Sequence, residues 1–266
     1  MEGLGYVASL LMGLSLGMIG GGGSILTVPI LVYLFHVQPL LASGYSLFIV
    51  GLTALLGSFA YIKQGQVDLK IGAVFALPSF IGVYSVRSLL LPSLPDPVLS
   101  WGALILSKNL TIMLVFALLM IAASYSMIRP VKIQDASREV HRSLPIHWVA
   151  LEGLLVGGVT GLVGAGGGFL IIPALVLLVG LPMKKAVGTS LLIIAVKSLF
   201  GFLGDVQQQA SIDWNFLLTL ASIAVAGIYA GTYLSRFISE TKLKKAFGWF
   251  VAIMGTTILF EQLRHL

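Results

Sequence analysis

The sequence predicts an all-α polytopic membrane protein made of two inverted repeats, each a glycine-broken re-entrant helical hairpin followed by three transmembrane helices. Three observations predict this fold. Of 266 residues, 58% are hydrophobic and only 10% are charged, whereas soluble proteins carry roughly 25% charged residues. Two apolar stretches are interrupted by glycine runs, and one pattern of residues occurs in both halves of the chain. The composition therefore places most of the chain in a lipid bilayer.

Five apolar segments clearly have the length of membrane-spanning helices, and a sixth is slightly short. A span needs about 20 apolar residues at a rise of ~1.5 Å each. The segments are 42–62, 71–91, 109–129, 186–204, 215–235 and the slightly short 246–262. The N-terminal region contains an early acidic residue and lacks a basic stretch, so we expect no cleavable signal peptide.

Two further apolar segments, 4–35 and 147–180, are interrupted by glycine runs at 20–23 and 164–168. One continuous helix of either length would measure about 50 Å against a hydrocarbon core of ~30 Å, and each half is too short to span alone. We therefore expect broken, re-entrant helices. Unpaired backbone groups at the breaks cannot face lipid, so the breaks must be buried in protein or line a water-filled cavity.

The two halves of the chain match at an offset of 144 residues, which becomes 145 after one inserted residue. Paired positions include Gly13 and Gly157, Gly17 and Gly161, Pro29 and Pro173, Gly44 and Gly188, Ser46 and Ser190, and Asp68 and Asp213. Such self-similarity indicates an internal repeat. The chain divides into an N-terminal repeat (1–128), a cytoplasmic linker (129–145) and a C-terminal repeat (146–266).

The placement of Lys and Arg predicts that the repeats are inverted. Twelve of the 16 basic residues lie in one set of loops, at 63–70, 129–142, 184–185 and 236–245. The positive-inside rule assigns these loops to the cytoplasm. Each repeat then makes three full crossings, an odd number, so the second repeat is upside down. Because the basic charge serves orientation, we expect a multi-pass protein in contact with the lipid bilayer and with no nucleic-acid partner.

The glycine runs predict an anion-binding site. A helix that begins after a glycine turn presents four unpaired N–H groups and the positive end of its dipole. Inverted repeats bring two such helix starts together near the bilayer midplane, as in secondary transporters of anions. The substrate-binding residues predicted at the breaks are Gly22, Gly23, Ser24, Thr27, Gly166, Gly167, Gly168 and Phe169. The alternative is that the glycines only permit close helix packing, a role that the spacings Gly13-Gly17 and Gly157-Gly161 favour.

Lys197 is the most informative single residue, because it lies near the middle of segment 186–204 without an acidic neighbour in that segment. A lysine at the bilayer centre costs at least ~2.5–3.5 kcal/mol and usually faces a cavity. We therefore expect Lys197 to contact the anion or its entry path. The alternative is a lysine that snorkels or binds helix-end carbonyls, and the repeat mate Thr53 is uncharged.

Hydroxyl side chains on the matching helices, Ser46 and Ser190 among them, are further candidates for substrate binding. Together with Ser43, Tyr45 and Thr189, they either complete a shell around an oxyanion or make interhelical hydrogen bonds.

Two charged residues at helix ends have simpler expected roles. Arg87 is expected to be an interfacial anchor at the outer end of its helix, with a role as an anion ligand as the alternative. For Glu152 we expect a solvated helix start, with a role in proton coupling as the alternative.

The glycine-rich break followed by a proline, repeated in both halves, resembles the TauE/SafE sulfite exporter family, also called the toluene sulfonate uptake permease family. The stretches LLLPSLPDP and VFALLMIAASYSMIRP resemble its less characterised members. The resemblance covers nearly the whole chain. It implies a transporter in the cell inner membrane of a prokaryote that moves small sulfur-containing or organic anions such as sulfite or sulfonates. The motif says little about which anion.

These observations together predict a secondary transporter, not an enzyme, that moves a small anionic substrate by alternating access. A coupling proton or ion is expected because the chain contains no nucleotide-binding motif. A passive anion channel is the alternative; a membrane-embedded lipid-phosphate hydrolase is disfavoured because neither break carries an acid or histidine for catalysis. We expect no cofactor and no metal. The sequence leaves a homo-oligomer, the exact substrate and the direction of transport open.

Overall fold

The computed structural model describes residues 2–101, 104–128, 146–163, 167–177, 179–206, 212–235, 237 and 240–264. These residues form a helical bundle, as predicted, with one small exception. Strands β1 (Leu99–Trp101) and β2 (Leu104–Leu106) pair in an antiparallel hairpin between two long helices. The linker predicted at 129–145 lies outside the described residues.

Each of the six predicted spans is a helix. The helices are α3 (Pro39–Lys63), α4 (Leu69–Ser85), α6 (Lys108–Ile128), α9 (Met183–Val206), α10 (Trp214–Leu234) and α11 (Glu240–Arg264). After α4 the chain continues through a π-helical turn, η3 (Val86–Leu90), into α5 (Leu91–Ser93). Four stretches are long and apolar enough to cross a membrane, namely Pro39–Lys63, Leu69–Ser93, Lys184–Val206 and Trp214–Leu234. Shorter apolar stretches occur in other helices, α6 included.

Both glycine-interrupted segments are broken helices, as expected. The first comprises α1 (Glu2–Ile19), a 3₁₀ helix η1 (Gly21–Leu26), α2 (Thr27–Pro29) and a π-helical turn η2 (Ile30–Leu34). The second comprises α7 (Ile146–Val163) and α8 (Gly168–Leu177). Gly20 has φ 81° and Gly167 has φ 62°, a backbone conformation that glycine adopts without steric cost. After the first run the half-helix begins as a tighter 3₁₀ turn before it continues as α2.

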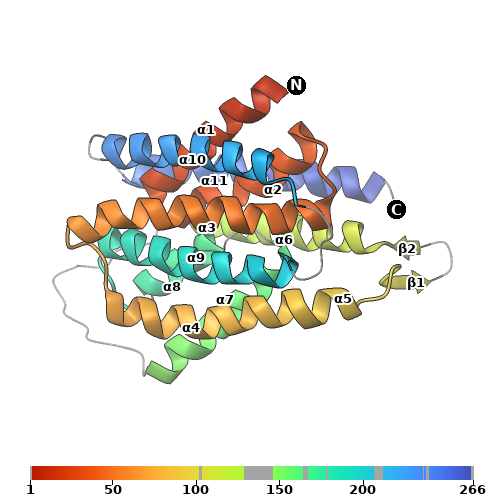
Figure 1. Cartoon of the computed structure of the whole chain (residues 1–266), viewed down its shortest axis with the longest axis horizontal. Coiled ribbons are helices and arrows are strands. Elements are labelled where there is room, and N and C mark those ends of the chain that lie inside the picture. Colours follow the sequence, from red (N-terminus) through yellow and green to blue (C-terminus); the bar gives the residue numbers. More distant parts are fainter. Residues whose placement is uncertain are drawn as a thin grey trace.

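The helices pack in pairs that correspond between the two halves (Figure 1). At the repeat offset, α1 corresponds to α7 and α4 corresponds to α10. In the structure α1 packs against α10, and α7 packs against α4. The remaining long helices pair with their own counterparts, α3 with α9 and α6 with α11. Exchanging the two halves therefore leaves this pattern of contacts unchanged.

Glycines set the close spacing of the α1–α10 and α4–α7 pairs. A Cβ atom on Gly13 would collide with the backbone of Ala224, and one on its repeat mate Gly157 would collide with the backbone of Ser79. Similarly close backbone contacts occur at Gly17, Gly82, Gly227 and Gly231, and a Cβ atom on Gly161 would lie 3.1 Å from the backbone of Val83. The packing role predicted from the Gly13-Gly17 and Gly157-Gly161 spacings is confirmed.

Reciprocal hydrogen bonds fix the starts of α4 and α10. The Asp68 N–H donates to Thr189 Oγ1 at 2.9 Å, and the Asp213 N–H donates to Tyr45 Oη at 3.1 Å. The two aspartates are repeat mates, and so are Thr189 and Tyr45. Each aspartate side chain also accepts a 3.0 Å bond from a backbone N–H in the first turn of its helix, the usual N-cap interaction. The start of α4 thus lies beside the start of α9, and the start of α10 beside that of α3.

The lysine-bearing helix ends gather at one end of the bundle. The end of α3 and the starts of α4 and α9 meet there, carrying the exposed side chains of Lys63, Lys70, Lys184 and Lys185. The β-hairpin and the C-terminal end of α11 lie at the opposite end (Figure 1). We call these the lysine end and the hairpin end. Their charge difference matches the loop sets from which the orientation was predicted.

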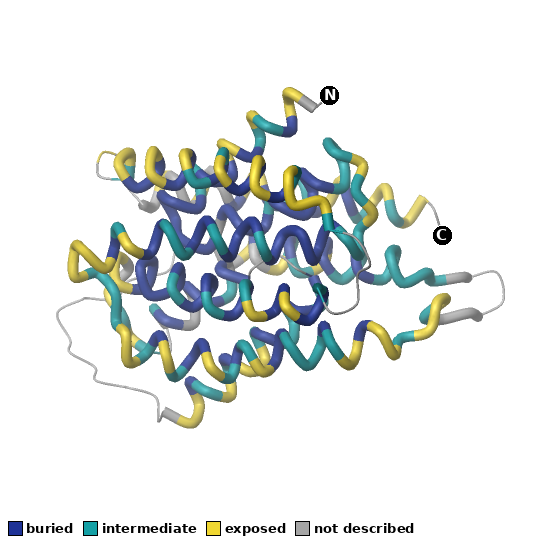
Figure 2. The backbone as a smooth tube through the Cα atoms, in the orientation of Figure 1, coloured by how far each residue is buried: buried dark blue, intermediate teal, exposed yellow. Residues whose placement is uncertain are grey.

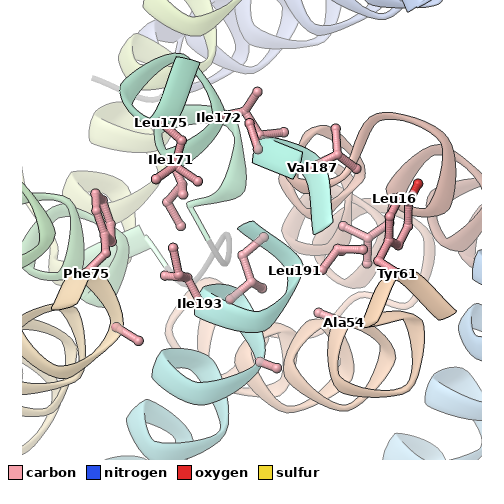
Figure 3. Packing of buried hydrophobic residues seen from close by; sticks show 14 of the residues in the cluster. Leu16, Ala54, Tyr61, Phe75, Ile171, Ile172, Leu175, Val187, Leu191 and Ile193 are labelled. Carbon is pink, nitrogen blue, oxygen red and sulfur yellow. The ribbon is translucent and has the colours of Figure 1, made fainter. Parts of the chain in front are cut away.

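The core lies around α3 and α9, whereas the outer faces of the surrounding helices are exposed (Figure 2). One buried cluster joins side chains from α1, α3, α4, α8 and α9, including Leu16, Tyr61, Phe75, Ile171 and Leu191 (Figure 3). Large exposed apolar side chains occur along the outer helices, among them Leu77, Leu118, Leu155, Leu218 and Ile253. Such a surface is suited to lipid contact.

Candidate functional site

The two helix breaks meet at Gly21 and Gly168. A Cβ atom on either residue would collide with the backbone of the other. Gly21 is the first residue of η1, Gly168 is the first residue of α8, and both are buried. The first turn of a helix carries backbone N–H groups without partners inside the helix. The structure therefore brings two such turns, one from each repeat, into direct contact.

The walls around this contact are mainly apolar and come from α8 and α9. Gly20 lies against Val187 and Ile172, and Gly168 lies against Ile194. The predicted site residue Ser190 also lies next to Gly20, and its Oγ donates to the Val187 carbonyl at 2.8 Å. Water is poorly accommodated by such walls, which strengthens electrostatic interactions between groups inside them.

Lys197 points toward the second break. Its Nζ donates to Thr160 Oγ1 on α7 at 3.0 Å, and a Cβ atom on Gly167 would lie only 2.6 Å from Nζ. The lysine is 0% exposed, which argues against the alternative that its side chain snorkels to the membrane surface. Its repeat mate Thr53 is also buried and donates to the carbonyl of Ile49 in its own helix at 2.6 Å. A lysine side chain therefore lies beside the second break, whereas its repeat mate in the first repeat is a neutral threonine.

The three predicted hydroxyl residues of the first repeat, Ser24, Thr27 and Ser46, differ in their hydrogen bonding. Ser24 Oγ donates to the Gly21 carbonyl at 2.7 Å, so its hydroxyl proton is used within its own turn in this structure, and its role as a donor to the anion stays a prediction. Thr27 Oγ1 and Ser46 Oγ are buried and have no hydrogen-bond partner within the described residues. Most buried side-chain hydroxyls are hydrogen-bonded. Thr27 and Ser46 are therefore suited to bind a polar ligand.

Three of the hydroxyl candidates have structural roles instead. Tyr45 and Thr189 accept the interhelical bonds that fix α10 and α4. Ser43 Oγ donates to the Leu40 carbonyl in its own helix at 2.7 Å. For these residues the interhelical or local hydrogen bond explains the side chain without a ligand.

The remaining predicted positions are less informative about binding. Gly166 lies outside the described residues, as does the side chain of Phe169, and Gly22 is placed within η1. A Cβ atom on Gly23 would come within 2.5 Å of backbone atoms of Met12 and Leu16 on α1. Gly23 therefore allows its half-helix to pack on α1, and the expected contact with the anion has no geometric support.

The interfacial anchor expected at Arg87 is wrong. Its side chain is 0% exposed, and Nη1 donates to Asp205 Oδ1 at 3.2 Å and Oδ2 at 3.0 Å. Sequence reasoning missed Asp205, which ends α9 at 118 positions from Arg87. The predicted topology places Arg87 and Asp205 toward the same face of the membrane, and this shared depth was the signal that could have identified them as a pair. Glu152 is only partly exposed and its Oε2 is buried, so the expected solvated helix start is also only partly right.

The sequence comparisons agree with the resemblance described above. The model of the family described as "Sulfite exporter TauE/SafE" matches residues 6–258. A protein of Xylella fastidiosa (strain 9a5c), named "Probable membrane transporter protein", is 29% identical over 94% of this chain and 92% of its own length.

Two further similar proteins come from other organisms. "Probable membrane transporter protein YdhB" of Bacillus subtilis (strain 168) is 26% identical over 94% of this chain and 97% of its own. "Probable membrane transporter protein MJ0441" of Methanocaldococcus jannaschii is 24% identical over 95% and 93%. No solved structure gives a significant match.

Proposed function

The chain belongs to the sulfite exporter TauE/SafE family of membrane transporters, and from this premise we propose that it is a secondary transporter of small sulfur-containing or organic anions. Sulfite and small sulfonates are the substrates that the family name favours. The proposed mechanism is alternating access, with the anion held where the two broken helices meet.

The contact between Gly21 and Gly168 carries this proposal. It brings together the starts of η1 and α8, one from each repeat. A helix start attracts anions through its unpaired N–H groups and its dipole. The N-terminal turns of η1 and α8 together therefore attract an anion more strongly than either turn alone. This attraction does not require a charged side chain from each repeat.

The side chains around the contact suit a small oxyanion. Lys197 supplies one positive charge beside Gly167. We further propose that the buried hydroxyls of Thr27 and Ser46 bind the anion, because neither has a hydrogen-bond partner within the described residues. Walls such as Val187 and Ile194 exclude water. A charge-assisted hydrogen bond in such surroundings is stronger than one between neutral groups.

The reciprocal contacts between the halves support the inverted-repeat mechanism. The pairs α1–α10 and α4–α7 exchange under the repeat offset. Inverted repeats are related by a pseudo-two-fold axis in the membrane plane. When the two repeats exchange conformations, a site that was open to one face of the membrane opens to the other face. The lysine end faces the cytoplasm in this proposal, by the positive-inside rule.

Counterflow in proteoliposomes tests the proposal. Purified protein is reconstituted into liposomes loaded with unlabelled sulfite, and uptake of trace labelled sulfite is followed against liposomes loaded with sulfate or with no anion. A carrier produces a transient, saturable accumulation driven by the unlabelled anion. Uptake of labelled sulfite that does not depend on the anion inside the liposomes would indicate a channel. Repeating the assay with imposed pH or sodium gradients identifies the coupling ion.

A further inference from the structure

A buried ion pair outside the central site joins the two repeats. Arg87 follows α4 in the π-helical turn η3, and Asp205 lies at the end of α9. Their side chains are 0% and 10% exposed, with the shortest N···O distance at 3.0 Å. π-helical turns of this kind occur frequently at functional sites. The pair is not part of the central site described above.

The pair lies between Lys197 and the hairpin end of the bundle. Asp205 follows Lys197 by eight residues on α9, a rise of about 12 Å along the helix. Two glycines make room for the pair. A Cβ atom on Gly44 of α3 would lie 2.6 Å from Asp205 Oδ2, and one on Gly204 would lie 3.0 Å from Arg87 Cβ.

The three residues at the equivalent positions of the repeat are neutral. The repeat mates of Arg87, Asp205 and Gly44 are Thr232, Tyr61 and Gly188. Gly188 packs against Tyr61, just as Gly44 packs against Asp205. The Tyr61 hydroxyl donates to the Gly17 carbonyl at 3.0 Å, and Gly17 lies against the backbone of Thr232. The fold can therefore close this place at the lysine end with neutral side chains.

The charges at the hairpin end consequently need an explanation other than packing. Removing two charges from water is expensive, and neutral residues of similar volume often stabilise a fold as well or better. A guanidinium group matches the geometry of carboxylates and of other oxyanions, because it presents several N–H groups in a fixed plane. The proposed substrates carry a charged group of this chemistry.

We propose that Arg87 is a second anion-binding residue, located between the hairpin end and the central site, and that Asp205 holds its guanidinium group when no anion is present. This inference rests on the proposed function and adds a step to it. A sulfonate, sulfite or carboxylate replaces the Asp205 carboxylate on Arg87 and then moves toward Lys197. The nearby negative charge of Asp205 weakens binding at Arg87, which makes this step transient.

Two variants test the inference. The double variant Arg87→Gln/Asp205→Asn leaves no lone buried charge. The single variant Asp205→Asn removes the competing carboxylate and keeps the guanidinium group. Anion uptake is measured in intact cells, which present the hairpin end in the proposed orientation, and in inverted membrane vesicles, which present the lysine end. Thermal unfolding of each purified variant shows whether it is folded.

We expect the double variant to raise the KM for sulfite about tenfold in intact cells, because it removes a charge-assisted hydrogen bond. Its KM in inverted vesicles should stay near the wild-type value. Asp205→Asn should lower the KM in intact cells severalfold and slow the maximal rate, since the anion leaves Arg87 more slowly. If the pair has a structural role alone, the double variant should have a lower unfolding temperature and unchanged KM values in both preparations.

The outcomes separate this inference from the proposed function. If the wild type shows saturable anion counterflow and the folded double variant has wild-type KM in intact cells, Arg87 is not an anion-binding residue while the transporter assignment holds. If the wild type shows no anion counterflow, the proposed function itself fails. Tighter binding by Asp205→Asn together with weaker binding by the double variant would support the exchange of Asp205 for the anion.

Discussion

Lys197 Nζ lies 3.0 Å from Thr160 Oγ1 and packs beside Gly167, so a fully buried ammonium group is held next to the turn that begins α8. This arrangement joins the third and first helices of the same repeat across a glycine break. In an apolar interior such a charge is costly unless polar groups or an anion surround it. The position of Lys197 is therefore the most direct point at which the anion site can be tested.

Lys197→Met should weaken anion binding at least tenfold. The substitution keeps the length and apolar stem of the side chain and removes one charge-assisted hydrogen bond, worth about 1.5–3 kcal/mol. Binding of sulfite to purified protein by isothermal titration calorimetry measures the effect. Lys184→Met, the same change at an exposed position on the same helix, is the matched control. A folded Lys197→Met protein with an unchanged Kd would assign the lysine a structural role.

Gly168→Ala should abolish transport and lower the unfolding temperature. The added methyl group collides with the Gly21 backbone and with Ile194, and overpacking of this kind costs about 1–3 kcal/mol. It also separates the two helix starts that the anion is proposed to bridge. Gly158→Ala is the control, because the nearest atom, Val86 Cγ2, is 4.0 Å from the added Cβ. Normal counterflow by Gly168→Ala would mean that the contact between the breaks is dispensable.

Thr189→Val and Tyr45→Phe should destabilise the protein by similar amounts. Each removes the acceptor of a backbone N–H at a helix start, Asp68 in one case and Asp213 in the other. A polar group left without its partner costs about 1–3 kcal/mol. Thr219→Val, at an exposed residue bonded within its own helix, should change stability by less than about 0.5 kcal/mol. Thermal unfolding in detergent measures all three, and a clearly unequal pair would argue against equivalent roles for the two contacts.

Single cysteines should report opposite sides for the two ends of the bundle. The chain contains no cysteine, so Lys184→Cys at the lysine end and Arg264→Cys at the hairpin end can be labelled individually. A membrane-impermeant maleimide added to intact cells should label position 264 and spare position 184, which should react after the membrane is opened. Gln208→Cys should behave like position 264. Labelling of positions 184 and 264 from the same side would contradict the proposed orientation.

The sequence alone predicted the helical class, the six long helices and the two broken ones. These features depend on local quantities, namely the length of apolar runs and the interruption of such runs by glycine. The helices α9 and α11 extend beyond the predicted spans by a few residues at each end, because charged and polar residues continue a helix beyond its apolar part. The 3₁₀ geometry of η1 was not predicted, since it depends on how the half-helix packs against α1 at Gly23.

The sequence also identified Lys197 and the glycine runs, because a charge or a glycine cluster in an apolar segment is unusual by itself. It determined the repeat as well, through residues that recur at a fixed offset. Which of these residues meet was decided by the tertiary structure. The pairing of Arg87 with Asp205, the contact of Gly21 with Gly168 and the commitment of Ser24 to a local bond depend on distances between separate helices. Local hydrophobicity fixes where helices form, but only their packing fixes which side chains share a buried site.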